Sequence, residues 1–176
     1  MQKRLFFWEL AGFLFTSALG TVLHFVYEWS GGALAAVFVS AVNESTWEHM
    51  KLLFVPMLLF SAVQVWAQRE PRPNFWAVRA LSTAAGLVLI PVLYYTYTGV
   101  WGQMRPWANI AVFFLAALGA FWLDFCLLRR SCLDAPWQQV VGGAVLAALA
   151  LCFVWCTFFP PHIALWRDPI TGSYGI

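Results

Sequence analysis

Residues 31–51, GGALAAVFVSAVNESTWEHMK, decide the fold of this chain. The stretch opens with an apolar run, Gly32–Val42, and turns polar at Asn43. A helix of about a dozen residues reaches only ~18 Å at 1.5 Å per residue, well short of the ~30 Å hydrocarbon core of a bilayer. We therefore expect Gly31–Met50 to be a re-entrant segment that enters and leaves a membrane on one side. A sixth membrane span over these residues is the alternative.

The sequence on either side is dominated by long apolar segments. Of the 176 residues, 62% are hydrophobic and 10% are charged, whereas soluble domains carry roughly 25% charged residues. This composition predicts an all-α, polytopic membrane helix bundle that forms one domain over residues 1–176. Glu9 interrupts the first apolar run and no hydrophilic domain follows it, which favours an uncleaved helix over a signal peptide. A span needs about 20 apolar residues, and the candidates are Leu5–Tyr27, Leu52–Ala67, Trp76–Thr98, Trp107–Leu128 and Val140–Phe159.

The positions of Lys and Arg favour five spans over six, because these residues concentrate in cytoplasmic loops. With five spans and a cytoplasmic N-terminus, the inside set is Lys3, Arg4, Arg69, Arg72, Arg79, Arg129 and Arg130, and the outside set is Lys51, Arg105 and Arg167. Six spans would divide the same residues equally. We expect a bacterial cytoplasmic membrane protein with its C-terminus outside and membrane lipids as its partners. The net charge of +2, without a basic stripe, argues against nucleic-acid binding.

In this topology most of the unusual polar residues fall on the outer side. Three imidazoles and a water molecule make a catalytic zinc arrangement, in which the water attacks an ester, amide or phosphoester. A glutamate nearby could act as general base. The sequence thus suggests a metal-dependent hydrolase of a lipid or periplasmic substrate. Its candidate zinc ligands are His24, His49 and His162; its candidate catalytic residues are Glu44, Glu48 and Ser45; and its candidate ligand-binding residues are Asn43, Glu28, Lys51, Arg167 and Asp168.

The same residues also fit a structural or ligand-binding network without catalysis. Lys51 follows Glu48 by three residues, so the two side chains share one face of a helix and can neutralise each other. Asn43 could cap the helix that follows it. Whether the chain is an enzyme stays open at this point.

A third hypothesis is a small transporter or channel subunit. Glu9 and Asp124 lie in the inner halves of two predicted spans and, with the outer acids, could bracket a proton path. Alternatively, Glu9 pairs with Lys3 and Arg4 at the inner interface, and Asp124 pairs with Arg129.

Small residues recur every fourth position in the first and last predicted spans. They are Gly12, Thr16 and Gly20 in the first, and Gly143 and Ala147 in the last. Small residues at this spacing let two helices approach closely. We expect internal packing from these faces, with a homo-oligomer as the alternative.

Two motifs resemble those of one protein family. Residues 43–52 have the pattern N-E-S-x-W-E-H-x-K-L, and residues 160–175 have the pattern P-P-H-x-x-x-x-x-D-P-x-T-G-x-Y-G. Together they resemble a family of small, uncharacterised bacterial multi-pass membrane proteins that is classed as a domain of unknown function. The resemblance covers essentially the whole chain and implies a bacterial membrane protein without an assigned activity. The seven-helix membrane hydrolases related to alkaline ceramidases, which use three histidines to bind zinc, serve only as an analogy.

Overall fold

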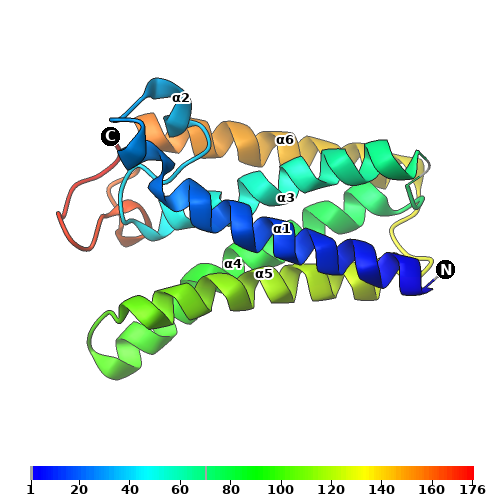
Figure 1. Ribbon diagram of the computed structural model, residues 1–176, viewed down its shortest axis with the longest axis horizontal. Helices are drawn as coiled ribbons and strands as arrows, with labels where there is room; N and C mark the ends of the chain where they lie inside the picture. The colour runs from blue at the N-terminus through cyan, green and yellow to red at the C-terminus, as the bar shows by residue number, and fades with distance from the viewer. Residues whose placement is uncertain (1, 70) are drawn as a thin grey trace.

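The computed structural model describes residues 2–69 and 71–176, and these residues form an all-helical bundle (Figure 1). Five long helices, each apolar enough to cross a membrane, run along the length of the molecule. They are α1 (Gln2–Trp29), α3 (Thr46–Gln68), α4 (Phe75–Trp101), α5 (Pro106–Leu128) and α6 (Pro136–Phe158). Helices of 23 residues or more reach about 35 Å, enough to span a bilayer. The predicted all-α fold is confirmed, and the five apolar helices indicate a multi-pass membrane protein.

The segment between α1 and α3 is not a sixth span. It contains only one short helix, α2 (Leu34–Val37), followed by irregular chain, and it lies at the end of the bundle that also holds the C-terminus (Figure 1). Its boundary differs from the prediction, because α3 begins at Thr46 and takes the polar residues up to Met50 into a span. The cap also differs: Ser45, rather than Asn43, caps α3, and its hydroxyl accepts a hydrogen bond from the Glu48 N–H at 3.3 Å.

The helices pack closely because small side chains line their contacts. Helix α1 packs against α3 and α5, while α4 packs against α3, α5 and α6. A Cβ atom added at Gly20 of α1 would lie 2.6 Å from the carbonyl oxygen of Leu52 in α3. Thr16 and Gly12 are buried as well. The small residues of the first span therefore serve packing inside the bundle, whereas Gly143 in α6 has open space beside it.

The C-terminal tail folds back over one end of the bundle. It contains a short 3₁₀ helix, η1 (Ala164–Trp166), and an isolated antiparallel bridge between Arg167 and Tyr174. The Trp166 ring stacks on Trp47 of α3, with ring centroids 4.6 Å apart. These contacts hold the tail against the polar start of α3.

Candidate functional site

His24, Glu44 and His49 form a cluster at the end of the bundle that carries the tail. The Glu44 Oε1 atom lies 3.9 Å from His24 Nε2, and Glu44 Oε2 lies 3.5 Å from His49 Nε2. One potential ligand atom from each of the three residues lies within 4.8 Å of the other two. The two imidazole rings meet edge to face, with centroids 5.2 Å apart. Two histidines and one carboxylate are a donor set that zinc uses in catalytic sites.

Three different elements bring these side chains together. His24 comes from α1, Glu44 from the loop before α3, and His49 from the first turn of α3. The His49 Nδ1–H donates to the Ser45 carbonyl oxygen at 2.9 Å. This hydrogen bond leaves the lone pair of Nε2 directed at Glu44, which is how proteins orient a metal-binding histidine.

A cavity of about 340 Å³ adjoins the cluster, with Glu44, His24 and His49 in its lining. The rest of its wall is mostly apolar and comes from α1, α3 and α5; it includes Phe25, Leu52, Pro106, Ile110, Phe113 and Phe114. A second, smaller hollow of about 40 Å³ meets the same cluster from the side of Tyr94 in α4. A volume of this size and an apolar wall with few polar groups are typical of small-molecule sites.

Asn109 of α5 is the polar residue that both hollows share with Glu44 and His49. Its Oδ1 atom accepts a hydrogen bond from the Tyr97 hydroxyl of α4. The Tyr97 oxygen in turn lies 3.5 Å from the backbone N–H of Arg105, which donates to it. The phenol proton is therefore committed to Asn109 Oδ1, and the amide N–H₂ group of Asn109 makes no hydrogen bond within the described residues.

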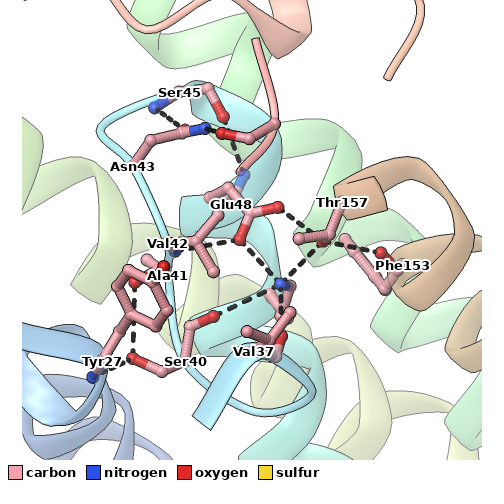
Figure 2. A network of polar contacts seen from close by, with 12 residues as sticks. Tyr27, Val37, Ser40, Ala41, Val42, Asn43, Ser45, Glu48, Phe153 and Thr157 are labelled. Carbon is pink, nitrogen blue, oxygen red and sulfur yellow. Dashed lines mark hydrogen bonds and ion pairs between the residues drawn. The ribbon is translucent and has the colours of Figure 1, made fainter. Parts of the chain in front are cut away.

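Glu48 and Lys51 belong to a separate, fully buried network (Figure 2). The Lys51 ammonium donates to Glu48 Oε2 at 2.7 Å, to the Thr157 hydroxyl at 2.9 Å and to the Val37 carbonyl at 3.0 Å. The Thr157 hydroxyl of α6 donates to Glu48 Oε1 at 2.7 Å. The Val42 N–H also donates to Glu48 Oε2. The pair thus joins α3, α6 and the segment around α2, and its donors and acceptors are satisfied.

The tail supports the loop that carries Glu44. The Asn43 amide donates to the Gly175 carbonyl at 2.8 Å, and the Asp168 carboxylate accepts from the Glu44 N–H at 3.5 Å. Burial by itself would raise the pKa of Asp168, but the N–H groups of Ile170 and Thr171 donate to its carboxylate. The net effect holds the pKa of Asp168 below its ordinary value. Asp168 is therefore a structural anion of the folded tail.

Besides Glu48 and Lys51, three further predicted site residues lie apart from the cluster. The His162 ring packs against the Tyr174 ring, with centroids 4.6 Å apart, and is exposed. Glu28 and Arg167 are exposed as well. The described residues therefore combine two of the three predicted histidines with Glu44, which was predicted as a catalytic group rather than a ligand. Ser45 is occupied as the cap of α3.

A second polar group lies near the other end of the bundle. The Arg79 guanidinium of α4 contacts Asp124 Oδ2 of α5 at 2.8 Å and Glu9 Oε2 of α1 at 3.4 Å. Gln64 of α3 accepts from Arg79 at 2.7 Å and donates to Glu9 at 3.0 Å. The Ser82 hydroxyl donates to Asp124 Oδ1 at 2.6 Å. Four helices are tied together by this one cation.

This arrangement differs from the pairing that the sequence suggested. Glu9 and Asp124 pair with Arg79, rather than with Lys3, Arg4 or Arg129. The sequence places Arg79 on the cytoplasmic side, near the start of the predicted span Trp76–Thr98, and its side chain is 1% exposed inside α4. The position of Arg79 within the apolar run that starts at Phe75 is the sequence signal that indicates a buried, paired side chain.

Thr157 and Asn109 had no recognised role in the sequence. Thr157 is an isolated hydroxyl in an apolar helix, where Ser and Thr often bond only to their own backbone. Its hydroxyl does lie 2.9 Å from the Phe153 carbonyl oxygen, but it also lies 2.7 Å from Glu48 Oε1. A role for Asn109 is visible only in the structure, where it contacts Tyr97 and lines the same hollow as Glu44.

Residues 2–176 match the model of a family of unknown function, DUF6512. Because the match covers nearly all of the chain, this protein belongs to that family. No curated protein matches the sequence, and no solved structure matches the fold. Function must therefore be inferred from the site itself.

Proposed function

We propose that this protein is a membrane-embedded hydrolase that binds one zinc ion through His24, Glu44 and His49. The observation that carries the proposal is the convergence of these three side chains at the wall of a cavity. Catalytic zinc sites keep three protein ligands and leave one coordination position for water. Two histidines and a glutamate fit that pattern.

The spacing of the donor atoms supports this assignment. Zinc–nitrogen bonds of about 2.1 Å in a tetrahedral site put neighbouring donors roughly 3.4 Å apart. Each carboxylate oxygen of Glu44 lies near one imidazole, Oε2 at 3.5 Å from His49 Nε2 and Oε1 at 3.9 Å from His24 Nε2, and one donor atom from each residue lies within 4.8 Å of the other two. Small side-chain rotations would complete the site, because His24 and Glu44 are both partly exposed. Bound zinc would supply an activated water for hydrolysis.

The purely structural hypothesis accounts for a different set of residues. Glu48, Lys51 and Thr157 satisfy one another and connect three parts of the fold. His24 and Glu44, by contrast, make no short hydrogen bond through their side chains within the described residues. A network that only stabilised the fold would have no need of these two half-exposed groups facing a cavity.

Transport is less well supported than hydrolysis. Gln64, in the group around Arg79, lies 16 residues after Glu48 in α3, or about 24 Å along the helix axis. The core between these levels is built from apolar side chains such as Leu53, Met57 and Ala117. No Asp, Glu, Lys, Arg or His occurs between Lys51 and Gln68. A proton path along α3 would therefore lack ionisable side chains to relay the proton.

We also propose that the site faces the outside of a bacterial cytoplasmic membrane, with the N-terminus in the cytoplasm. The support is the excess of exposed Lys and Arg at the end of the bundle that holds the N-terminus, where Lys3, Arg4, Arg69, Arg129 and Arg130 lie, over the other end, where Arg105 and Arg167 lie. The zinc ion would then be acquired from the outer compartment.

The test is metal analysis of protein purified without chelators. We expect about one zinc per chain in the unmodified protein, and a loss of zinc in His49→Ala and His24→Ala. His162→Ala is the matched control, because this third histidine lies outside the cluster and its variant should keep the metal. Absence of zinc from the unmodified protein, even after incubation with zinc salts, would refute the proposal.

A further inference from the structure

We infer that the substrate is an acyl lipid whose hydrocarbon chain lies in the cavity beside the cluster, with its carbonyl oxygen hydrogen-bonded to the amide of Asn109. This inference rests on the proposed zinc site and names the substrate class for it. Three features support it: the apolar wall of the cavity, the position of the cavity on the bundle, and the amide N–H₂ group of Asn109, which is free of hydrogen bonds within the described residues.

The wall of the cavity suits a hydrocarbon chain. Away from the cluster it is formed by Phe25, Leu52, Ile110, Phe113 and Phe114. An alkyl chain placed here would exchange lipid contacts for contacts with aromatic and aliphatic side chains. A water-soluble, polar substrate would find few hydrogen-bonding partners along this wall, which makes it a poor fit.

The cavity also lies where a lipid could enter it. Ile110 is 59% exposed, Phe25 is 42% exposed and Phe114 is 38% exposed on the outer surface of α1 and α5. Both helices are long and apolar enough to cross a membrane, so this outer surface faces lipid. An acyl chain can therefore reach the site sideways from the bilayer without passing through water.

Asn109 marks the polar end of the binding site. Because Tyr97 holds its Oδ1 atom, the amide N–H₂ group is the part left to face a ligand. Asn109 lines both hollows together with Glu44 and His49, so a carbonyl group bound between them would meet the donor and the zinc site at once. A donor aimed at a carbonyl oxygen stabilises the negative charge that develops there during acyl transfer.

The reaction that follows is hydrolysis of an ester or amide. The oxygen of a water molecule forms a bond to the carbonyl carbon, and the bond from that carbon to the leaving oxygen or nitrogen breaks. One proton of the water passes to the leaving group, which departs as an alcohol or amine, and the acyl chain departs as a carboxylic acid. No oxidant or second substrate is needed.

The first experiment measures binding without catalysis, using the zinc-loaded protein in lipid nanodiscs. The probes are acetohydroxamate and dodecanohydroxamate, which share a zinc-binding group and differ in chain length. We expect the long-chain probe to bind at least tenfold more tightly. In Ile110→Trp, which narrows the cavity, that preference should fall several-fold. Leu115→Trp is the control, since Leu115 is exposed on the same helix but does not line the cavity.

The second experiment measures hydrolysis of p-nitrophenyl acetate, octanoate and dodecanoate. We expect kcat/KM to rise with chain length, and Asn109→Ala to lower kcat about a hundredfold, in line with the loss of one such donor, while zinc content stays unchanged. Tyr97→Phe, which frees the amide to rotate, should lower kcat by less.

Three results have distinct meanings. Equal binding and equal turnover of short and long chains, with zinc present, would overturn the acyl-lipid inference and leave the zinc site standing. Zinc-loaded protein that binds neither hydroxamate would overturn it as well. Protein that takes up no zinc would instead refute the proposed function on which the inference rests.

Discussion

Lys51 is the residue on which the polar end of the fold depends most directly. Its ammonium group has three protons and four nearby acceptors: Glu48, Thr157 and two backbone carbonyls of the segment around α2. Lys51 is 1% exposed and Glu48 is 2% exposed. Removing one partner of such a pair leaves an uncompensated buried charge, which costs more than the pair itself contributes.

We therefore predict that Lys51→Met lowers the stability of the protein by about 3–5 kcal/mol, seen as a clear drop in melting temperature in detergent. The double variant Lys51→Met/Glu48→Gln should recover part of the loss, because it leaves no unpaired carboxylate. Lys3→Met, at an exposed position, is the control and should melt as the unmodified protein does. A Lys51→Met protein with an unchanged melting temperature would show that the pair is dispensable.

Helix α6 approaches the backbone of α4 closely beside Trp76, at Gly142. A Cβ atom added at Gly142 would lie 2.5 Å from the Trp76 carbonyl oxygen and 2.7 Å from the Ala77 Cα. Both are backbone atoms of α4, which cannot rotate away as a side chain could. At the next residue, Gly143, an added Cβ atom would have no other atom within 4 Å.

This difference predicts opposite effects for two neighbouring substitutions. Gly142→Ala should push α6 away from α4 and lower the melting temperature. Gly143→Ala should keep the melting temperature or raise it, because alanine favours a helix over glycine by about 1 kcal/mol. Thermal unfolding of the two variants side by side provides the measurement. Equal effects would mean that α6 does not pack on α4 through Gly142.

The number and type of elements could be predicted because membrane spans are set by local composition. Gly32–Val42 is too short to cross a bilayer whatever its surroundings, and this length agrees with the positions of Lys and Arg in favouring five spans. The start of α3 was predicted less well. Ser45 and Asn43 are both good helix caps, and only the bond from Asn43 to Gly175 in the tail shows why Asn43 is used elsewhere.

The topology predicted from the Lys and Arg positions placed His24 and His49 at the same end of the molecule, where their rings are in contact. The sequence could not show that Glu44 lies between them, because its side chain is placed by a loop that the tail supports. His162 was grouped with them for the same reason of sidedness, yet the tail turns its ring onto Tyr174. The ion pairs of Arg79 with Glu9 and Asp124 depend on how each helix is rotated about its axis. Counting charges along the sequence cannot predict such pairs.

The orientation of the whole bundle decides which compartment supplies the zinc ion and water. Figure 1 places the two termini at opposite ends of the bundle. With Arg79 and Lys51 buried in ion pairs, the remaining basic side chains are divided six to two. Lys3, Arg4, Arg69, Arg72, Arg129 and Arg130 lie in the N-terminal region or in the α3–α4 and α5–α6 loops, and Arg105 and Arg167 lie in the α4–α5 loop and the tail. This division is more uneven than the seven to three counted from the sequence, so the positive-inside rule applies more strongly.

We therefore predict that, in intact cells, a membrane-impermeant maleimide labels Thr171→Cys in the exposed tail but not the native Cys132 in the loop between α5 and α6. Cys132 should react only after the membrane is permeabilised. The lipid-facing Cys152 should stay unlabelled in both conditions, because maleimides need a thiolate in contact with water. The reverse pattern, with Cys132 labelled from outside, would place the His24–Glu44–His49 cluster on the cytoplasmic side and make the cytoplasm its source of zinc.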